Sequence, residues 1–193
     1  HSSPVWAQQL SAGIRDQGVH VLNLGMVPTP LVYFYTYHFS LGAAVAITGS
    51  HNPPDYNGFK MMLDGQALYG QQVSSLYEEM LALEEQDMLN GTGREQSINI
   101  IPGYIQRITQ DVKLKRPMKI AIDCGSGVGA VVATKLFQHL GCIVDELYCQ
   151  VDPEFPHHHP DPADPNNLQD LIQHVQTSDC EIGLAFDGDA DRL

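Results

Sequence analysis

Three aspartates at alternate positions stand near the end of the chain, in the stretch FDGDADR. Asp187, Asp189 and Asp191 follow directly on the apolar run IGLAF. In an extended segment, alternate side chains point the same way, so the three carboxylates would converge. Converging carboxylates repel one another, and a divalent cation such as Mg²⁺, which prefers hard oxygen ligands, relieves the repulsion. The pattern therefore predicts a magnesium site, which is favoured over a solvated acidic turn because the cluster directly follows an apolar run. An EF-hand is excluded, because Arg192 stands where its loop requires glycine.

A serine is the second candidate reacting group. Ser50 lies in AVAITGSHNPPDYNGFK, where a charge-free apolar run, 43–47, is followed by a proline pair. Because Pro53 and Pro54 cannot continue a helix or an internal strand, we expect Ser50 on an exposed turn anchored by a buried strand. A purely structural turn is the alternative interpretation, since Ser, Asn and Pro are ordinary turn formers.

The surroundings of Ser50 distinguish between two kinds of serine chemistry. An acyl hydrolase is disfavoured, because no G-x-S-x-G elbow surrounds Ser50 and the adjacent His51 cannot easily turn back to take its proton. Phosphoryl transfer fits better: a serine can carry a phosphoryl group and a metal can neutralise its oxygens. Lys60 and Arg192 are cations that could stabilise the transition state.

A glycine-rich turn supports a different hypothesis. CGSGVGA places Gly125, Gly127 and Ala130 in G-x-G-x-x-A spacing, and Asp145 follows at about the distance of a ribose-binding acid. This leaves open an NAD-linked oxidoreductase. Against it, Asp123 directly precedes the turn, where a carboxylate would oppose a pyrophosphate. A tight strand-to-helix turn is the favoured interpretation.

The three histidines of HHHP, residues 157–159, are a possible transition-metal site. Consecutive histidines rarely converge in a proline-rich loop, and no neighbouring cysteine or spaced histidine completes a ligand set. We therefore favour a structural or interdomain loop.

Composition limits the class of protein. The net charge of −13, from 10 basic and 23 acidic residues, argues against nucleic acid or an anionic membrane as the partner. With 43% hydrophobic and 17% charged residues, the chain is typical of globular proteins. No signal peptide or membrane-spanning apolar run is present, so a soluble protein is expected. The cysteines form no CxxC pair, which predicts reduced, packed thiols in the cytoplasm; they are Cys124, Cys142, Cys149 and Cys180.

Strand-like and helix-like segments alternate along the chain. The expected strands are 19–24, 43–47, 58–63, 118–122, 142–148 and 181–186, and apolar residues fall at helical spacing between them, as over 71–89 and 128–140. This predicts an α/β fold of two consecutive mixed, mostly parallel sheet domains with helices on both faces. A polar, glycine-rich stretch, 90–97, is the expected linker between domains 1–96 and 97–193. Ligands bind outside the carboxyl ends of such strands, so an interdomain cleft is the expected site.

Several motifs together resemble one family. ITGSHNPPDYNGFK is similar to the phosphoserine loop of the α-D-phosphohexomutases, and FDGDADR resembles their metal loop. GMVPTP and FPHHHPDPADPNNL resemble further segments, in the same order along the chain. The resemblance is greatest to the bacterial bifunctional phosphomannomutase/phosphoglucomutase branch and runs through essentially the whole chain.

The resemblance implies a role for each matching residue. Ser50 would be the phosphorylated residue, and the three aspartates would bind Mg²⁺ together with a phosphoserine oxygen. His51 and Lys60 would lie beside the phosphoryl group, with Lys60 a candidate general acid/base if cationic surroundings lower its pKa. Arg192 would orient phosphate or phosphoserine.

The resemblance also implies the reaction and the extent of the parent protein. Ser50 would give its phosphoryl group to a glucose or mannose 1- or 6-phosphate. The resulting 1,6-bisphosphate would turn around in the cleft and return its other phosphoryl group to Ser50. The family has four domains. The chain begins at His1 rather than Met and stops just after the acidic motif, so we expect a fragment holding a shortened first domain and most of the second. Alone it is expected to be inactive, which leaves a non-catalytic metal-binding fragment as an alternative. The parent is expected to be a cytoplasmic monomer whose partner is a phosphosugar.

Overall fold

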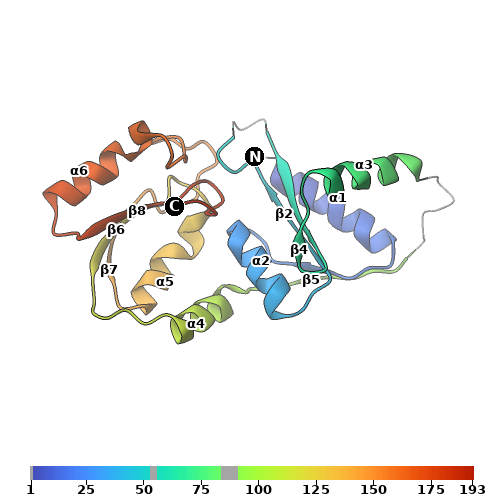
Figure 1. The fold of residues 1–193 in the computed structure, drawn as a ribbon, viewed down its shortest axis with the longest axis horizontal. Coiled ribbons are helices and arrows are strands. Elements are labelled where there is room, and N and C mark those ends of the chain that lie inside the picture. Colours follow the sequence, from blue (N-terminus) through green and yellow to red (C-terminus); the bar gives the residue numbers. More distant parts are fainter. Residues whose placement is uncertain (1, 53–55, 84–90) are drawn as a thin grey trace.

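The computed structural model describes residues 2–52, 56–83 and 91–193, which form two α/β halves side by side (Figure 1). The first half contains α1 (Ser3–Asp16), β1 (Val21–Asn23), α2 (Thr29–His38), β2 (Ala43–Thr48), β3 (Gly58–Leu63), β4 (Gln66–Ala67), α3 (Gln71–Ala82) and β5 (Glu95–Ser97). The second half contains α4 (Ile101–Asp111), β6 (Lys119–Asp123), α5 (Ala133–His139), β7 (Ile143–Leu147), α6 (Gln169–Thr177) and β8 (Ile182–Ala185). Short 3-10 turns, Val128–Val131 and Pro165–Leu168, precede α5 and α6.

The second half is a parallel sheet covered on both faces. Its strand order is β7-β6-β8, and both pairings of the central strand β6 are parallel. Alternate residues of β6 face opposite sides: Ile120 and Ile122 pack in the cluster that includes α5, and Ala121 packs against Leu171 of α6. A strand buried on both faces reads as a continuous apolar run, which is what this segment shows. The predicted α/β class with helices on both faces is confirmed.

The first half supplies the antiparallel part of the mixed architecture. β2, β3 and β4 form an antiparallel sheet, while β1 and β5 form a separate parallel pair. The register of β2 and β3 runs from Ala43 opposite Leu63 to Thr48 opposite Gly58. The Ser50 loop returns the chain directly from β2 to β3, and a direct return gives antiparallel pairing, whereas a parallel pair needs a long crossover.

The predicted linker over 90–97 is wrong for its last residues, which form β5. Glu95 lies opposite Val21 in β1 and accepts hydrogen bonds from Ser11 Oγ at 2.6 Å and Asn23 Nδ2 at 2.8 Å. A Cβ on Gly93 would meet the Val19 carbonyl oxygen at 2.2 Å, so this glycine permits close backbone packing. The polar composition that suggested a linker reflects the exposure of all three β5 residues. The boundary after residue 96 stays a prediction.

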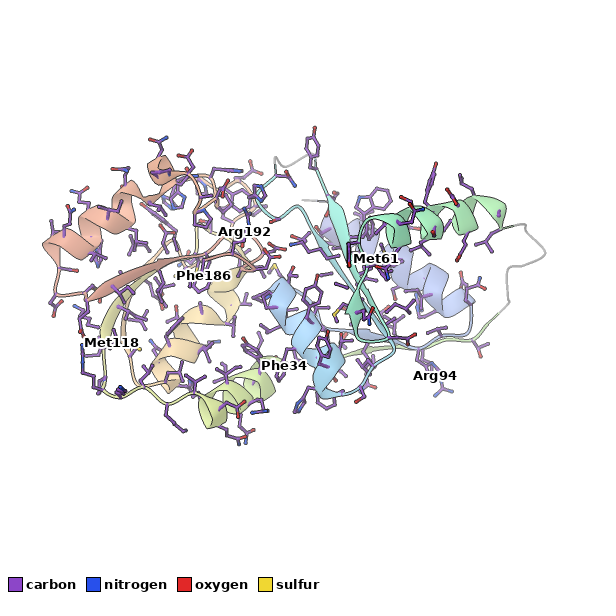
Figure 2. All side chains as sticks on the ribbon, viewed as in Figure 1. Phe34, Met61, Arg94, Met118, Phe186 and Arg192 are labelled. Atoms are coloured by element: carbon purple, nitrogen blue, oxygen red, sulfur yellow. The ribbon has the colours of Figure 1, made fainter. Side chains whose placement is uncertain are left out.

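A shared apolar core joins the two halves. Leu31 and Tyr35 of α2 pack with Ile105 of α4 and with Val132 at the start of α5. Beside this cluster, the Phe34 ring meets the Tyr104 ring edge-on at 5.0 Å, and Phe34 marks this side of α2 in Figure 2. Burial of apolar side chains between the halves stabilises their arrangement, and that arrangement positions the loops described below.

The helices are short, and one of them ends earlier than the sequence predicted. The helix predicted over 71–89 is observed as α3, which ends at Ala82; residues 84–90 lie outside the described part of the chain. Within the described ranges, no helix has the length and apolar character needed to cross a membrane.

Candidate active site

Ser50 occupies a tight turn just beyond the carboxyl end of β2. Its φ of 51° lies in the left-handed region, which is uncommon and costly for a residue with a side chain. The Ser50 N–H donates to Thr48 Oγ1 at 2.8 Å, which holds the turn against the strand end. The Pro53-Pro54 pair lies outside the described residues. Ser50 thus lies on a turn at the strand end as expected, but it is half-buried rather than exposed, and β2 is only partly buried.

A turn in the acidic loop after β8 brings the three carboxylates together. Ala190 has a φ of 55°, and its N–H donates to the Asp187 carbonyl at 3.0 Å. Asp187 Oδ1 accepts the backbone N–H groups of Asp191 and Arg192 at 3.0 Å each. The extended backbone assumed from the alternating pattern is wrong, because Asp187 binds the N–H groups of its own loop and curls it. One oxygen from each aspartate nevertheless lies within 4.8 Å of the other two.

The serine turn and the acidic loop meet at the junction of the two halves (Figure 1). Ser50 Oγ donates to Asp187 Oδ2 at 2.9 Å. The loop backbones also touch: a Cβ on Gly188 would lie 2.2 Å from the Ser50 carbonyl oxygen, closer than any real contact. Asp187 is fully buried and Asp189 is 3% exposed. The Ser50 turn and the acidic loop, which the sequence placed in different halves, thus lie together at one site.

Arg192 bridges the two loops and is labelled at their junction in Figure 2. Its Nε and Nη2 donate to Asp187 Oδ2 at 3.1 and 2.7 Å, and Nη2 also lies 3.4 Å from Ser50 Oγ. Burial lowers the pKa of this guanidinium, but the hydrogen bonds and charge of Asp187 outweigh burial and raise it. Arg192 is therefore a fixed positive charge beside the serine hydroxyl.

His51 lies closer to Ser50 than the sequence suggested. Its Nδ1 is 3.3 Å from Ser50 Oγ, so the expectation that the adjacent ring cannot turn back is wrong. The same nitrogen contacts Arg192 Nη2, which can only donate. No carboxylate among the described residues hydrogen-bonds His51, so the orienting acid of a Ser-His-Asp triad is missing from that set. The geometry still disfavours acyl transfer.

Lys60 reaches the acidic loop from β3. Its Nζ lies 2.7 Å from Asp189 Oδ2 and 2.6 Å from Asp191 Oδ2. Partial burial lowers the pKa of this amine, but the hydrogen bonds and charges of the two aspartates outweigh burial and raise it. The condition set for Lys60 as general acid/base, a pKa lowered by cationic surroundings, is not met in this structure, because the nearest groups are carboxylates.

The donor set fits a hard divalent cation. Asp189 Oδ2 is occupied by Lys60 and by Thr29 Oγ1, whereas Asp189 Oδ1 is buried with no hydrogen-bond partner among the described residues. A buried carboxylate oxygen without a partner is costly unless a cation or donor satisfies it. Three converging aspartates with such an oxygen, next to a serine hydroxyl, are the oxygen ligands that Mg²⁺ prefers.

Thr29 is a site residue that the sequence motifs did not single out. It is the first residue of α2, but it does not cap the helix, because Pro28 holds the cap position and makes no side-chain cap bond. Instead, Thr29 Oγ1 donates to Asp189 Oδ2 at 2.7 Å and its N–H donates to the Asp189 carbonyl at 3.0 Å. No local sequence signal could have found this contact, because its partner lies 160 residues away.

Comparison with known proteins identifies the family to which this site belongs. Residues 1–87 match "Phosphoglucomutase/phosphomannomutase, alpha/beta/alpha domain I", and residues 102–193 match the corresponding domain II. The chain belongs to the phosphoglucomutase/phosphomannomutase family. The resemblance read from the sequence motifs is confirmed at this level.

Individual relatives in this family agree. The chain is 51% identical over 195 residues to a protein from Neisseria meningitidis serogroup B named "Phosphoglucomutase". It is 45% identical over 192 residues to a "Phosphomannomutase/phosphoglucomutase" from Pseudomonas aeruginosa. Both alignments cover 100% of this chain but 42% and 41% of those proteins. A solved family structure from Burkholderia thailandensis matches with a TM-score of 0.87 at 43% identity, covering 96% of this chain and 42% of that one. The chain thus spans less than half the length of these relatives.

In this member of the family, the glycine-rich turn is filled by protein. A Cβ on Gly127 would lie 2.8 Å from the Gly188 carbonyl oxygen, and one on Gly125 would lie 3.0 Å from Pro160. In a dinucleotide-binding turn, backbone N–H groups bind the pyrophosphate. Here the Val128 N–H donates to the Gly188 carbonyl at 3.0 Å and so supports the acidic loop instead. The glycines make the tight turn that was favoured, and the dinucleotide alternative lacks its binding surface.

Asp145 likewise has partners away from the glycine-rich turn. It lies opposite Ala121 in the middle of β7, so it is not at the carboxyl end of the sheet where the turn lies. Its Oδ2 is 3.0 Å from His174 Nε2 and 3.4 Å from Lys119 Nζ. The hydrogen bond from His174 is the main cause that holds its pKa below the ordinary value. A ribose-binding role for Asp145 is therefore not supported.

The histidine run has a structural role in the described loop. The His157 ring stacks on Tyr148 with ring centroids 3.9 Å apart, and His158 Nε2 lies 3.0 Å from a carboxylate oxygen of the fully buried Asp123. The hydrogen bond to Asp123 raises the pKa of His158 despite burial. The histidines thus point to different partners, and the Asp123 and His158 pair ties the 151–165 loop to the end of β6.

Proposed function

We propose that the full-length parent of this chain is a Mg²⁺-dependent phosphohexomutase that works through phosphorylated Ser50. It would interconvert the 1- and 6-phosphates of glucose or mannose by way of a 1,6-bisphosphate. The observation that carries this proposal is the 2.9 Å hydrogen bond from Ser50 Oγ to Asp187, within a cluster of three converging aspartates. Membership of the family supports the same reaction class.

The charge of the site explains why a cation is needed. A phosphoryl group on Ser50 would bring about −1.5 to −2 charges next to the buried Asp187 carboxylate. Mg²⁺ held by Asp187, Asp189 and Asp191 would supply the positive charge that neutralises phosphoryl oxygens in the transition state. The partnerless Asp189 Oδ1 supports this assignment.

The protein's own cations complete the proposed site. Arg192 Nη2 lies 3.4 Å from Ser50 Oγ, a position from which a guanidinium can donate to a phosphoryl oxygen. His51 Nδ1 lies 3.3 Å from the same oxygen, and a contact of His51 with the phosphoryl group stays a prediction from the family resemblance. Lys60 balances the charge of Asp189 and Asp191, and its use as general acid/base stays a prediction from the family resemblance.

The proposed transfer balances in each direction. The P–O bond to Ser50 Oγ breaks while a P–O bond to a sugar oxygen forms, and the proton of that sugar hydroxyl ends on Ser50 Oγ. The bisphosphate then presents its other phosphoryl group to Ser50 for the reverse step. Rigid placement of Ser50 against the acidic loop supports transfer in line, because misplacement of reacting groups is costly.

The whole reaction is proposed for the parent protein, and this chain alone is proposed to bind the metal without turnover. The relatives it matches are more than twice its length, and the proposal assigns part of the sugar-binding surface to segments beyond this chain. Ser50 and the aspartates, which are present here, would form the metal-binding phosphoserine site.

Replacement of Ser50 tests this function directly. We expect Ser50→Ala in the full-length protein to abolish Mg²⁺-dependent conversion of glucose or mannose 1-phosphate to the 6-phosphate, because the phosphoryl carrier is lost. Ser74→Ala, an exposed serine in α3, is the matched control and should keep wild-type turnover. Undiminished turnover in Ser50→Ala, or wild-type turnover that resists removal of Mg²⁺ by a chelator, would refute the proposal.

A further inference from the structure

Two cysteines meet at the carboxyl end of the parallel sheet, outside the proposed active site. Cys124 follows β6 and Cys149 follows β7, the neighbouring strand. Their sulfur atoms are 3.3 Å apart, and the Cys124 N–H donates to the Leu147 carbonyl at 3.2 Å, which fixes the two chain segments side by side. The other cysteines of the chain, Cys142 and Cys180, are buried and have no sulfur partner among the described residues.

The two thiols differ in access to solvent. Cys124 is fully buried, whereas Cys149 is half-buried and lines a surface pocket of about 340 Å³. Tyr148, Asp152 and His157 line the same pocket, which has room for a small polar oxidant. A reagent in solution therefore meets Cys149 first, and Cys124 lies directly behind it.

Cys149 is the cysteine of the pair whose pKa is lowered, although its thiol can also donate to the Ile122 and Leu147 carbonyls. The hydrogen bond shared by the pair lowers the pKa of Cys149 and raises that of Cys124, because the thiol that stays protonated donates to the other. The Thr134 hydroxyl also lowers the pKa of Cys149, and its oxygen is buried with no hydrogen-bond partner in the described part of the chain. Burial opposes this shift. A thiolate is the nucleophilic form of cysteine.

We propose that Cys149 and Cys124 form a dithiol that peroxides oxidise reversibly to a disulfide. The Cys149 sulfur attacks one peroxide oxygen, the O–O bond breaks, and Cys149 becomes a sulfenic acid while the other oxygen leaves as water. The Cys124 sulfur then attacks the Cys149 sulfur, the S–O bond breaks, and the Cys124 proton leaves with the hydroxyl as a second water. The two sulfurs are each oxidised by one electron and the peroxide is reduced by two.

The position of the pair connects it to the acidic loop. Closing the bond requires the sulfurs to approach from 3.3 Å to about 2.05 Å, which is a small movement for side chains. Cys124 begins a turn in which the Gly127 N–H donates to the Cys124 carbonyl at 2.7 Å. Val128, the residue after Gly127, donates its N–H to the Gly188 carbonyl. A covalent link at Cys124 therefore forms directly beneath the turn that supports the aspartates.

A peptide map of the full-length protein tests the dithiol. The reduced protein is treated with hydrogen peroxide under native conditions, unfolded, alkylated and digested without reductant. We expect alkylation to be lost at Cys124 and Cys149, a cross-linked peptide joining them, and its disappearance after dithiothreitol, while Cys142 remains alkylated. Retained alkylation at both cysteines, or Cys149 joined to any other cysteine, would overturn the proposal.

Single substitutions assign the order of events. In Cys124→Ala the sulfenic acid on Cys149 should persist and be trapped by dimedone, whereas Cys149→Ser should leave Cys124 fully alkylatable after peroxide. Oxidation of Cys124 in Cys149→Ser would contradict the assignment of Cys149 as the attacking thiol. Circular dichroism checks that both variants fold, and the wild-type map decides the disulfide without them.

Discussion

Asp189→Asn in the full-length protein is expected to weaken Mg²⁺ binding about 100-fold or more, since even outer partners of metal ligands contribute about 10- to 100-fold. The reason is specific to one atom: Asp189 Oδ1 is buried and has no partner among the described residues. Asparagine keeps an oxygen for Thr29 and Lys60 but removes the charge and places an amide nitrogen in the cluster. Titration calorimetry with Mg²⁺ measures the effect.

Asp111→Asn is the matched control for this change. Asp111 ends α4 and forms a surface ion pair with Arg107, so its replacement removes the same charge away from the site. Its Mg²⁺ affinity should equal that of the wild type. If Asp189→Asn also binds Mg²⁺ with unchanged affinity, the acidic loop is not the metal site.

Gly188→Ala is expected to lower kcat/KM of the full-length protein about 100-fold, because a misplacement of about 1 Å in a catalytic arrangement costs that much. A Cβ at this position would lie 2.2 Å from the Ser50 carbonyl oxygen and 3.0 Å from the Ser50 carbonyl carbon. Both are backbone atoms, so the serine turn and the acidic loop must separate. Steady-state assays give the rate, and thermal unfolding shows whether the fold survives.

A second glycine separates crowding from a general effect of alanine. A Cβ on Gly103, in α4, would meet nothing within 4 Å, and alanine favours a helix interior over glycine by about 1 kcal/mol. Gly103→Ala should therefore keep full activity and unfold at an equal or higher temperature. Wild-type activity in Gly188→Ala would show that the close approach of the two loops is unnecessary.

The sequence was informative where local patterns determine structure. Apolar runs predicted β6, β7 and β8, and the motifs at strand ends predicted that Ser50 and the aspartates would meet between the halves. The structure shows this meeting through the 2.9 Å contact of Ser50 with Asp187. The backbone conformation of the acidic loop was not predicted correctly. The aspartates alternate in sequence as in an extended segment, yet a turn organised by Asp187 brings them together.

Contacts between distant residues could not be predicted from one sequence. Nothing in the local sequence marks Thr29 as a site residue, but its hydroxyl donates a hydrogen bond to Asp189. Glu95 looked like part of a linker, but β5 pairs with β1, and Ser11 and Asn23 hydrogen-bond the Glu95 carboxylate. Such roles depend on which segments the fold places side by side, and polar residues in short segments carry no periodic signal of it.

The most direct test of the central claim is the intact mass of the full-length protein after incubation with Mg²⁺ and a hexose 1,6-bisphosphate. The proposed function predicts a gain of one phosphoryl group in the wild type, located at Ser50 by peptide mapping, and no gain in Ser50→Ala. A wild-type protein that gains no phosphoryl group, or an equal gain in Ser50→Ala, would contradict it.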